Sequence, residues 1–389
     1  MPIVDAELLA EIQAWRRDIH AHPELSLEEH RTSAFVAERL REFGCDEVAT
    51  GLGKTGVVGV IKGTKTATDG SVKVIGLRAD MDALPIEEMT NLPYASKNDG
   101  VMHACGHDGH TAMLLGAARH LAETRNFAGA VVVIFQPAEE VGGGAAPMIE
   151  DGMMERFGIE QVYGMHNWPG LPVGTFAVRP GVITTTVSVF EIRIEGRGGH
   201  ASRPETCIDP VLAGAQLVTA LQQIVARNVD PLDSAVITVT NFHAGPQFGA
   251  VIPQTAVLGC NIRALGPEVL KLVEKRVRQM VAGIAQMTGA KIDLTYIAGG
   301  PGIVNHAAQT ELAMRAAKDV AGEGNVHGMR PHMHGEDFAY MLEARPGAYI
   351  FCGNGDSEEL HHPAYKFNDE ALVHGTSFWI KLVENTLAT

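Results

Sequence analysis

A short stretch of the chain combines metal-binding side chains with residues that allow tight turns. From Gly100 to His110 the sequence reads GVMHACGHDGH, with three histidines, one cysteine and one aspartate. Cys105 and His107 are two residues apart in this glycine-rich turn, so a thiolate and an imidazole can point at one place. Both groups are good ligands for zinc and similar metals. A small buried cysteine beside a surface histidine is the alternative, and this pair alone does not decide between the two.

Two adjacent carboxylates follow an apolar run further along the chain. Glu139 and Glu140 lie in the sequence QPAEEVGGG, where three glycines provide little steric cover. Such a pair can divide the work of metal-dependent hydrolysis, because one carboxylate can bind the metal while the other takes a proton from water. A solvated acidic turn is the alternative, since isolated carboxylate pairs are usually exposed.

Further polar side chains follow other apolar runs. His166 comes directly after one run, and His361 and His362 follow another, after a Gly-Asn-Gly turn and an acidic stretch. Each histidine by itself is more often a surface or hydrogen-bonded residue than a ligand. Asp80 and Asp82 close a further run and can orient ligand histidines through hydrogen bonds, although turn or helix-capping aspartates are the plainer interpretation.

The elements that position these residues are predicted from apolar patterning. Four short runs are apolar almost throughout, as buried strands of a parallel sheet are: Val72–Leu77, Ala130–Phe135, Gln161–Met165 and Ala348–Cys352. Ligands of open α/β sheets bind beyond the carboxyl ends of the strands, so the polar residues that follow these runs are expected to converge. Helical spacing is found at Leu8–His20, Arg31–Phe43 and Thr111–Thr124.

A second pattern occupies the middle of the chain. Strand-like and helix-like segments alternate in the order βαββαβ, which is typical of a ferredoxin-like, two-layer domain: Thr185–Glu195, Pro210–Asn228, Ser234–His243, Thr255–Ala264, Pro267–Thr288 and Lys291–Ile297. We therefore expect an α/β catalytic domain at 1–183 and 298–389, with a smaller domain inserted at 184–297. The longest linkers are expected at Val178–Gly181 and Ala298–Gly302.

Composition narrows the classes of function. The 389 residues exceed the usual size of a single core, and 46 % hydrophobic with 20 % charged residues is typical of a globular protein. A formal charge of -15 argues against a nucleic-acid partner. No apolar run approaches membrane-spanning length, and the first twenty residues carry charges where an export signal has an apolar core. The five scattered cysteines favour a reducing compartment, so we expect a cytoplasmic protein.

The inserted domain carries one more candidate. The sequence EGRGGHASRPE places His200 behind two glycines after a predicted strand. A histidine at such a tip can reach another domain or subunit and stabilise a developing oxyanion, and a plain surface histidine is the alternative. The chain contains no P-loop, no G-x-S-x-G elbow and no H-E-x-x-H helix.

Eight motifs together resemble one family of metalloenzymes. In order they are RRDIHAHPELSLEEHRT, GLRADMDALPI, MHACGHDGHTAMLLGAA, FQPAEEVGGGA, GMHNWPGLPVG, GRGGHASRPE, GEDFAYM and LHHPAYKFND. They are similar to the motifs of the hippurate hydrolase, N-acyl-amino-acid amidohydrolase and plant auxin-conjugate hydrolase branch of the dinuclear metallopeptidase and aminoacylase family. The resemblance runs from about Trp15 to the C-terminus. It implies a zinc-peptidase-like α/β domain with an inserted ferredoxin-like lid that usually dimerises.

The resemblance also implies roles for individual residues. By motif position it makes Glu139 the general acid/base, Asp82 the acid that supports the metal site, and His200 a lid residue that meets the substrate carbonyl, commonly across a dimer. His361 is preferred to His362 because the ligand in the family directly follows the leucine of L-H-x-P. The metal ligands that it implies are Cys105, His107, Glu140, His166 and His361.

The lid motif of this chain departs from the family pattern. Ala250–Pro253 reads Ala-Val-Ile-Pro where relatives typically have Asn-Val-Ile-Pro, and Cys260-Asn261 precedes Ile262-Arg263 where they often have Gly-Thr. The lid asparagine helps to hold substrate in related enzymes. Asn261 and Arg263 are the candidates for substrate binding in its place.

The function expected from this sequence is metal-dependent hydrolysis of an N-acyl amino acid to a carboxylic acid and a free amino acid. Two divalent ions per subunit, zinc, manganese, cobalt or nickel, are the expected cofactors. A homodimer or homotetramer formed through the lid is the expected assembly, with neither a nucleic acid nor a membrane as partner. A metallo-dipeptidase or carboxypeptidase and a catalytically silent binding relative are the alternatives, and turnover of hippurate and acetyl-amino acids against dipeptides separates them.

Overall fold

The computed structural model describes residues 3–66, 73–247 and 249–388. The four apolar runs form adjacent parallel strands, in the spatial order β4, β3, β5 and β16. Their bounds are Val74–Asp80 for β3, Ala130–Gln136 for β4, Gln161–Pro169 for β5 and Gly347–Gly355 for β16. The predicted parallel sheet is thus confirmed. Val72, the predicted first residue of the strand that corresponds to β3, lies outside the described residues.

Short or antiparallel strands extend this sheet on both sides. Among the described residues it is eight-stranded, with the order β1-β2-β4-β3-β5-β16-β6-β15. The added strands are β1 at Glu47–Leu52, β2 at Gly56–Lys62, β6 at Phe176–Ala177 and β15 at Val326–His327. The parallel strands are therefore central, and the residues that follow them meet at one edge of the sheet.

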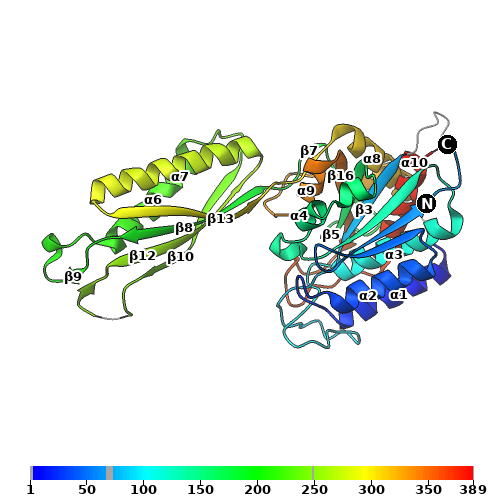
Figure 1. Ribbon diagram of the computed structural model, residues 1–389, viewed down its shortest axis with the longest axis horizontal. Helices are drawn as coiled ribbons and strands as arrows, with labels where there is room; N and C mark the ends of the chain where they lie inside the picture. Colours follow the sequence, from blue (N-terminus) through cyan, green and yellow to red (C-terminus); the bar gives the residue numbers. More distant parts are fainter. Residues whose placement is uncertain (1–2, 67–72, 248, 389) are drawn as a thin grey trace. The chain divides into compact units, whose positions relative to one another are not determined.

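Helices cover both faces of this sheet (Figure 1). Every residue of β4 is buried, as expected for a strand with protein on both sides. The helices are α1 (Ala6–Ala21), α2 (His30–Glu42), α3 (His107–Thr124), α4 (Ala145–Glu150), α5 (Met153–Arg156), α8 (Ala307–Ala321), α9 (Phe338–Ala344) and α10 (Glu370–Thr386), with 3-10 turns η1 (Glu139–Val141) and η3 (Glu323–Asn325). Helix α3 begins four residues before the predicted Thr111, so His107 and His110 both lie in its first turn.

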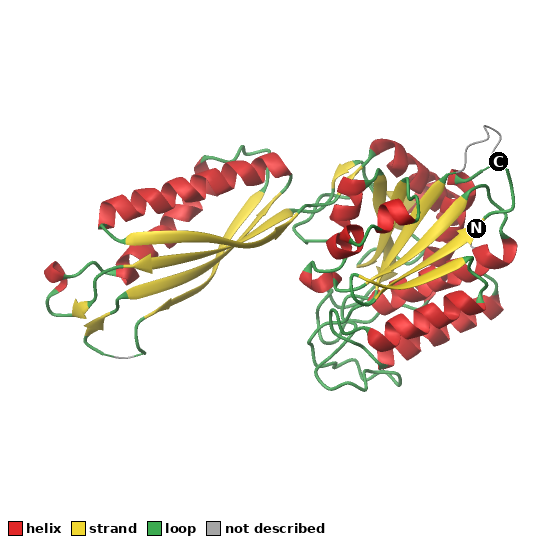
Figure 2. Ribbon diagram, in the orientation of Figure 1, coloured by secondary structure: helices red, strands yellow, loops and turns green. Residues whose placement is uncertain are grey.

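The inserted segment folds as predicted, into a βαββαβ unit with helices on one face of its sheet (Figure 2). The antiparallel strand order is β10-β12-β8-β13, which is the order of a ferredoxin-like sheet. Its elements are β8 (Thr186–Glu195), α6 (Pro210–Arg227), β10 (Ala235–Ala244), β12 (Thr255–Ala264), α7 (Pro267–Thr288) and β13 (Lys291–Gly300). The connection after β8 contains β9 (Gly199–His200), which pairs with β11 (Val251–Ile252), and η2 (Pro204–Thr206).

The chain divides into two compact units. The larger unit comprises residues 1–181, 304–330 and 336–389, and the smaller unit comprises 182–303 and 331–335. Residues 331–335 belong to the smaller unit because the carbonyl oxygen of His334 accepts the N–H of Thr185 and that of Met333 accepts a hydrogen bond from Arg263. Short strands β7 (Gly181–Val182) and β14 (Val304–Asn305) pair with each other. They lie where the chain passes from the larger unit into the smaller one and back.

One predicted linker is partly wrong. Strand β13 continues through Gly300, whereas the sequence suggested a linker from Ala298. A register shift after Tyr296 allows Gly299 and Gly300 to stay paired with β8, so the glycines extend the strand.

Among the described residues, no helix has both the length and the apolar composition needed to cross a membrane.

Candidate metal centre

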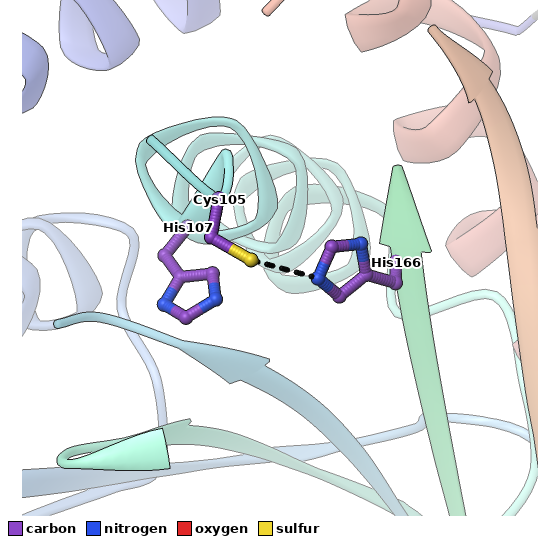
Figure 3. Close-up of side chains that lie close together, drawn as sticks. All are labelled: Cys105, His107 and His166. Carbon is purple, nitrogen blue, oxygen red and sulfur yellow. Dashed lines mark hydrogen bonds between the residues drawn. The ribbon is translucent and has the colours of Figure 1, made fainter. Parts of the chain in front are cut away.

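The turn that carries Cys105 and His107 depends on the glycine between them. Gly106 has a φ of 91°, in the left-handed region that favours glycine. A Cβ atom at this position would clash with the Asn167 amide and with the hydroxyl of Tyr365. Glycine therefore lets the chain enter α3 sharply, with the side chains of Cys105 and His107 both buried. Figure 3 shows these two side chains beside His166, which comes from β5.

The hydrogen bonds of His107 leave one ring nitrogen available. Nδ1 lies 2.9 Å from the carbonyl oxygen of Asp82 and 3.1 Å from its carboxylate Oδ1. Both partners accept, so Nδ1 carries the proton, and in the neutral ring Nε2 keeps its lone pair. Burial opposes the charged imidazole, but the contributions of Asp80, Cys105 and Asp82 together outweigh it and raise the pKa of His107. Asp82 thus has the contact expected of a residue that orients a ligand histidine.

His166 presents its ring to Cys105 in the same way. Its Nδ1 donates to the carbonyl oxygen of Asn167 at 2.6 Å, and its Nε2 lies 3.3 Å from the sulfur of Cys105. Figure 3 draws this contact as a dashed line. Burial raises the pKa of the Cys105 thiol, and the charge of Glu140 raises it further. A thiolate at this position therefore requires a cation beside it.

Glu140 and His361 complete the cluster from the other side. Oε2 of Glu140 lies 3.3 Å from Nε2 of His361, and Oε1 lies 3.8 Å from Nε2 of His107. The backbone places His361 here, since its N–H donates to the carbonyl oxygen of Ala104 and its φ is 67°. The five predicted ligands, distant in sequence, are thus brought together at the carboxyl edge of the sheet.

These residues fit a pair of metal ions. Two groups of three ligand atoms, each within 4.8 Å of one another, share the sulfur of Cys105: one adds His107 and His166, the other Glu140 and His361. Ligands at about 2.0–2.3 Å from one tetrahedral ion lie roughly 3.5 Å apart, close to the spacings observed. Nε2 of His107 and Oε1 of Glu140 are buried without a hydrogen-bond partner in the described part of the chain, which is costly unless a cation satisfies them.

Glu139 lies between this cluster and a second group of carboxylates. Its carboxylate lies within 4.8 Å of ligand atoms of His107 and Glu140, and also of Glu336 and Asp337. Desolvation raises the pKa of Glu139, and the charges of Glu336 and Glu140 raise it further. A carboxyl group with a raised pKa beside the metal ligands is suited to accept and return a proton.

Sequence reasoning assigned no role to His110, Arg78, Glu336 or Asp337. Nδ1 of His110 donates to Asp80 at 2.6 Å, because its Nε2 accepts the N–H of Asn167. Both ring nitrogens are therefore used, and His110 orients neighbours instead of offering a lone pair. A helix begun at His107 would have indicated this residue, since positions three apart share a helix face. Glu336 and Asp337 lie in the quoted motif GEDFAYM, and nothing in their spacing points to Arg78.

The other three predicted site residues lie in the smaller unit. His200 is exposed on β9, where it pairs with Val251 of β11 next to Ala250. Asn261 and Arg263 lie on the same face of β12, and Nη1 of Arg263 donates to Met333 at 2.5 Å. Asn261 is six residues beyond Thr255, or about 20 Å along the strand at about 3.3 Å per residue. Thr255 pairs with Glu195, the last residue of β8 before the connection that carries His200, so Asn261 lies far along the strand from the point where that connection begins.

Comparisons with known proteins cover nearly the whole chain. The model of "Peptidase family M20/M25/M40" matches residues 76–385. The chain is 44 % identical to "Hippurate hydrolase" of Campylobacter jejuni, over 97 % of this chain and 96 % of that protein. It is 42 % identical to "N-acetyl-L-cysteine deacetylase" of Bacillus subtilis, over 93 % and 85 % respectively.

A solved structure agrees with these matches. The crystal structure of the YXEP protein of Bacillus subtilis, described as a dinuclear metal binding peptidase from the M20 family, superposes with a TM-score of 0.86 at 36 % identity. The superposition covers 99 % of this chain and all of that one. The resemblance of the sequence motifs and the predicted α/β fold with its inserted domain are thereby confirmed.

Proposed function

The chain belongs to peptidase family M20/M25/M40, and on this basis we propose that it is a metal-dependent amidohydrolase that cleaves N-acyl amino acids to a carboxylic acid and a free amino acid. The observation that carries the proposal is the sulfur of Cys105, common to two three-ligand groups. Cys105, His107 and His166 would hold one divalent ion, and Cys105, Glu140 and His361 the other. Zinc, manganese, cobalt and nickel all suit this mixture of ligands.

The chemistry divides between the ions and the side chains. When bound, the divalent ions would polarise the amide carbonyl and lower the pKa of water. Glu139 accepts a proton from the attacking water as the new C–O bond forms at the amide carbon. It then returns the proton to the amine nitrogen as the C–N bond breaks. Asp82 keeps His107 in the tautomer whose Nε2 can bind metal, through the contacts at Nδ1.

His200 has the hydrogen-bond pattern that stabilisation of an oxyanion needs. Its Nδ1 lies 3.1 Å from the N–H of Ser202, which can only donate, so Nδ1 accepts. The ring proton of the neutral imidazole is then on Nε2, which is an oxyanion donor. We assign His200 this role toward the substrate carbonyl. Arg263 and Asn261 are assigned to the substrate, and Asn261→Ala with an unchanged KM would contradict the assignment for Asn261.

The assembly and location proposed for the protein follow from the resemblance and the cysteines. The smaller unit is assigned as a lid through which a homodimer or homotetramer forms, and sedimentation equilibrium of the metal-loaded protein tests this. Cytoplasmic location is proposed because the five cysteines are free and scattered.

The decisive experiment is a substrate panel on metal-reconstituted protein. Protein stripped with chelator and reloaded with manganese, cobalt, zinc or nickel is assayed against hippurate, N-acetyl amino acids and dipeptides. We expect turnover of the N-acyl amino acids that is lost on chelation and restored by metal. Preferential cleavage of dipeptides would favour a peptidase, and metal-loaded protein that leaves every N-acyl amino acid intact would refute the proposal.

A further inference from the structure

Glu29 is a buried carboxylate in the motif RRDIHAHPELSLEEHRT for which the proposed reaction has no use. It lies directly before α2 and is fully buried. Oε1 accepts the backbone N–H groups of Leu27 and Ala138, each at 2.9 Å, and Oε2 accepts the hydroxyl of Thr55. Both carboxylate oxygens are thus satisfied inside the larger unit, and one of them reaches a residue 109 positions away in the chain.

The residue that Glu29 reaches controls the direction of the Glu139–Glu140 pair. Ala138 has a φ of 52°, a left-handed conformation that is unusual for a residue with a Cβ atom. Such conformations persist where the surrounding structure holds them. The N–H of Ala138 is held by Glu29, and its carbonyl oxygen accepts the N–H of Gly143 at 2.9 Å. The backbone immediately before Glu139 is therefore fixed on both sides of Ala138.

Two other carboxylates hold the rest of the same loop. The N–H of Glu140 donates to Oδ2 of Asp82 at 3.0 Å. At the far end, Oδ2 of Asp337 accepts the N–H groups of Gly144 at 3.2 Å and Ala145 at 3.0 Å. Residues 137–145 are thus tied by their backbone amides to side chains from three distant segments. The hydrogen bond from Ala138 to Glu29 is the one at the start of the loop.

We propose that Glu29 is a positioning residue, whose Oε1 holds the Ala138 amide and thereby fixes where Glu139 and Glu140 lie relative to the metal ligands. The inference rests on the proposed function of those two glutamates. What the role requires is an acceptor atom at the right distance, whereas a negative charge is not needed. An amide oxygen at the same place can accept the same N–H groups.

Two substitutions distinguish the effect of side-chain length at position 29 from the effect of its negative charge. Glu29→Asp keeps the charge but withdraws the carboxylate by about one C–C bond, roughly 1.5 Å, out of reach of Ala138. Glu29→Gln removes the charge but keeps an acceptor oxygen. For Glu29→Asp we expect kcat to fall at least about tenfold with KM little changed, and manganese affinity to fall by a similar factor, because the buried Ala138 amide loses its acceptor. For Glu29→Gln, kcat and manganese affinity should both stay within about threefold of the native values.

The readouts include one that does not depend on activity. Manganese affinity is measured by competition with a chelator, and hydrogen exchange is followed in peptides covering residues 136–145. Exchange at the Ala138 amide should accelerate in Glu29→Asp and not in Glu29→Gln. The matched control is Glu24→Ala, since Glu24 accepts the N–H groups of Arg31 and Thr32, each at 2.8 Å, without touching the loop.

Each outcome decides the inference. A Glu29→Gln protein that is impaired as much as Glu29→Asp, or a Glu29→Asp protein that behaves as native, would overturn it. The inference would also be overturned if Glu24→Ala lost as much unfolding free energy as Glu29→Asp and lowered kcat by the same factor. Should Glu29→Asp fail to fold, near-native behaviour of Glu29→Gln is still required. If the native protein hydrolyses no N-acyl amino acid, the proposed function fails, while metal affinity and exchange still decide the role of Glu29.

Discussion

Replacing Arg78 by methionine is expected to lower the free energy of unfolding of the larger unit by about 3–5 kcal/mol, the usual cost of removing one partner of a buried ion pair. The side chain of Arg78 is fully buried. Its guanidinium lies 2.7 Å from Asp80, 3.0 Å from Glu336 and 3.3 Å from Asp337. These carboxylates are at most 5 % exposed, so water cannot replace the lost cation.

The cost of this substitution should depend on pH in a defined direction. Burial raises the pKa of Asp337 to about 7, although the nearby charge of Arg78 lowers it. Burial also opposes ionisation of Asp80, but His107, Arg78 and His110 together outweigh it and lower its pKa. Without Arg78 both pKa values rise, so the carboxyl groups are more easily protonated and their uncompensated charge disappears in acid. The stability gap between native and variant protein should therefore narrow from pH 8 to pH 5.5.

Urea denaturation followed by tryptophan fluorescence measures this gap. The three tryptophans, Trp15, Trp168 and Trp379, all lie in the larger unit, so their signal reports on that unit. The control is Arg156→Met, which removes a pair with Glu47 whose side chains are 53 % and 50 % exposed and should cost less than about 1 kcal/mol. The reasoning is refuted if Arg78→Met costs no more than the control, or if the gap stays constant or widens at pH 5.5.

Three further predictions concern the metal centre and its loop. Glu139→Gln should lower kcat by at least about 10²-fold without loss of metal, as measured by steady-state kinetics and elemental analysis, and retained activity would exclude Glu139 as the base. Cys105→Ser should reduce the bound metal below the native stoichiometry because it alters a donor common to both groups, whereas Cys352→Ser, a buried cysteine outside them, should not. Gly144→Ala should sharply reduce activity and thermal stability because its Cβ would clash with backbone at the start of the loop, while a Cβ at Gly143 would come no nearer than 3.3 Å to any neighbour, so Gly143→Ala serves as the control.

Much of the candidate site was predictable because its chemistry is concentrated after buried strands. Cys105, His166 and the pairs Glu139–Glu140 and His361–His362 were identified by type and by their place after or beside apolar runs, and the parallel sheet brings those places to one edge. The family resemblance then selected Glu140 and His361 as the ligands of the two pairs. His110 was missed because α3 begins earlier than its apolar pattern suggests. The turn around Gly106 permits that earlier start.

Other contacts left no local signal at all. Glu29 and Ala138 are 109 residues apart, and Asp337 and Ala145 are 192 apart, so neither pair forms a pattern within any sequence window. In the smaller unit the order of strands was predictable from alternation. The assignment of residues 331–335 to that unit was not, because it depends on single hydrogen bonds such as that from Arg263 to Met333.

The sequence by itself determined the four central strands, the insertion of a ferredoxin-like domain into an α/β domain, and the kinds of ligand atoms available. These are properties of local periodicity and side-chain chemistry. Only the tertiary structure decided that the sulfur of Cys105 is shared, which nitrogen of His107 keeps its lone pair, and which carboxylates hold backbone amides. These depend on distances of a few ångströms between segments far apart in the chain, which are set by packing and by the pairing of buried polar groups.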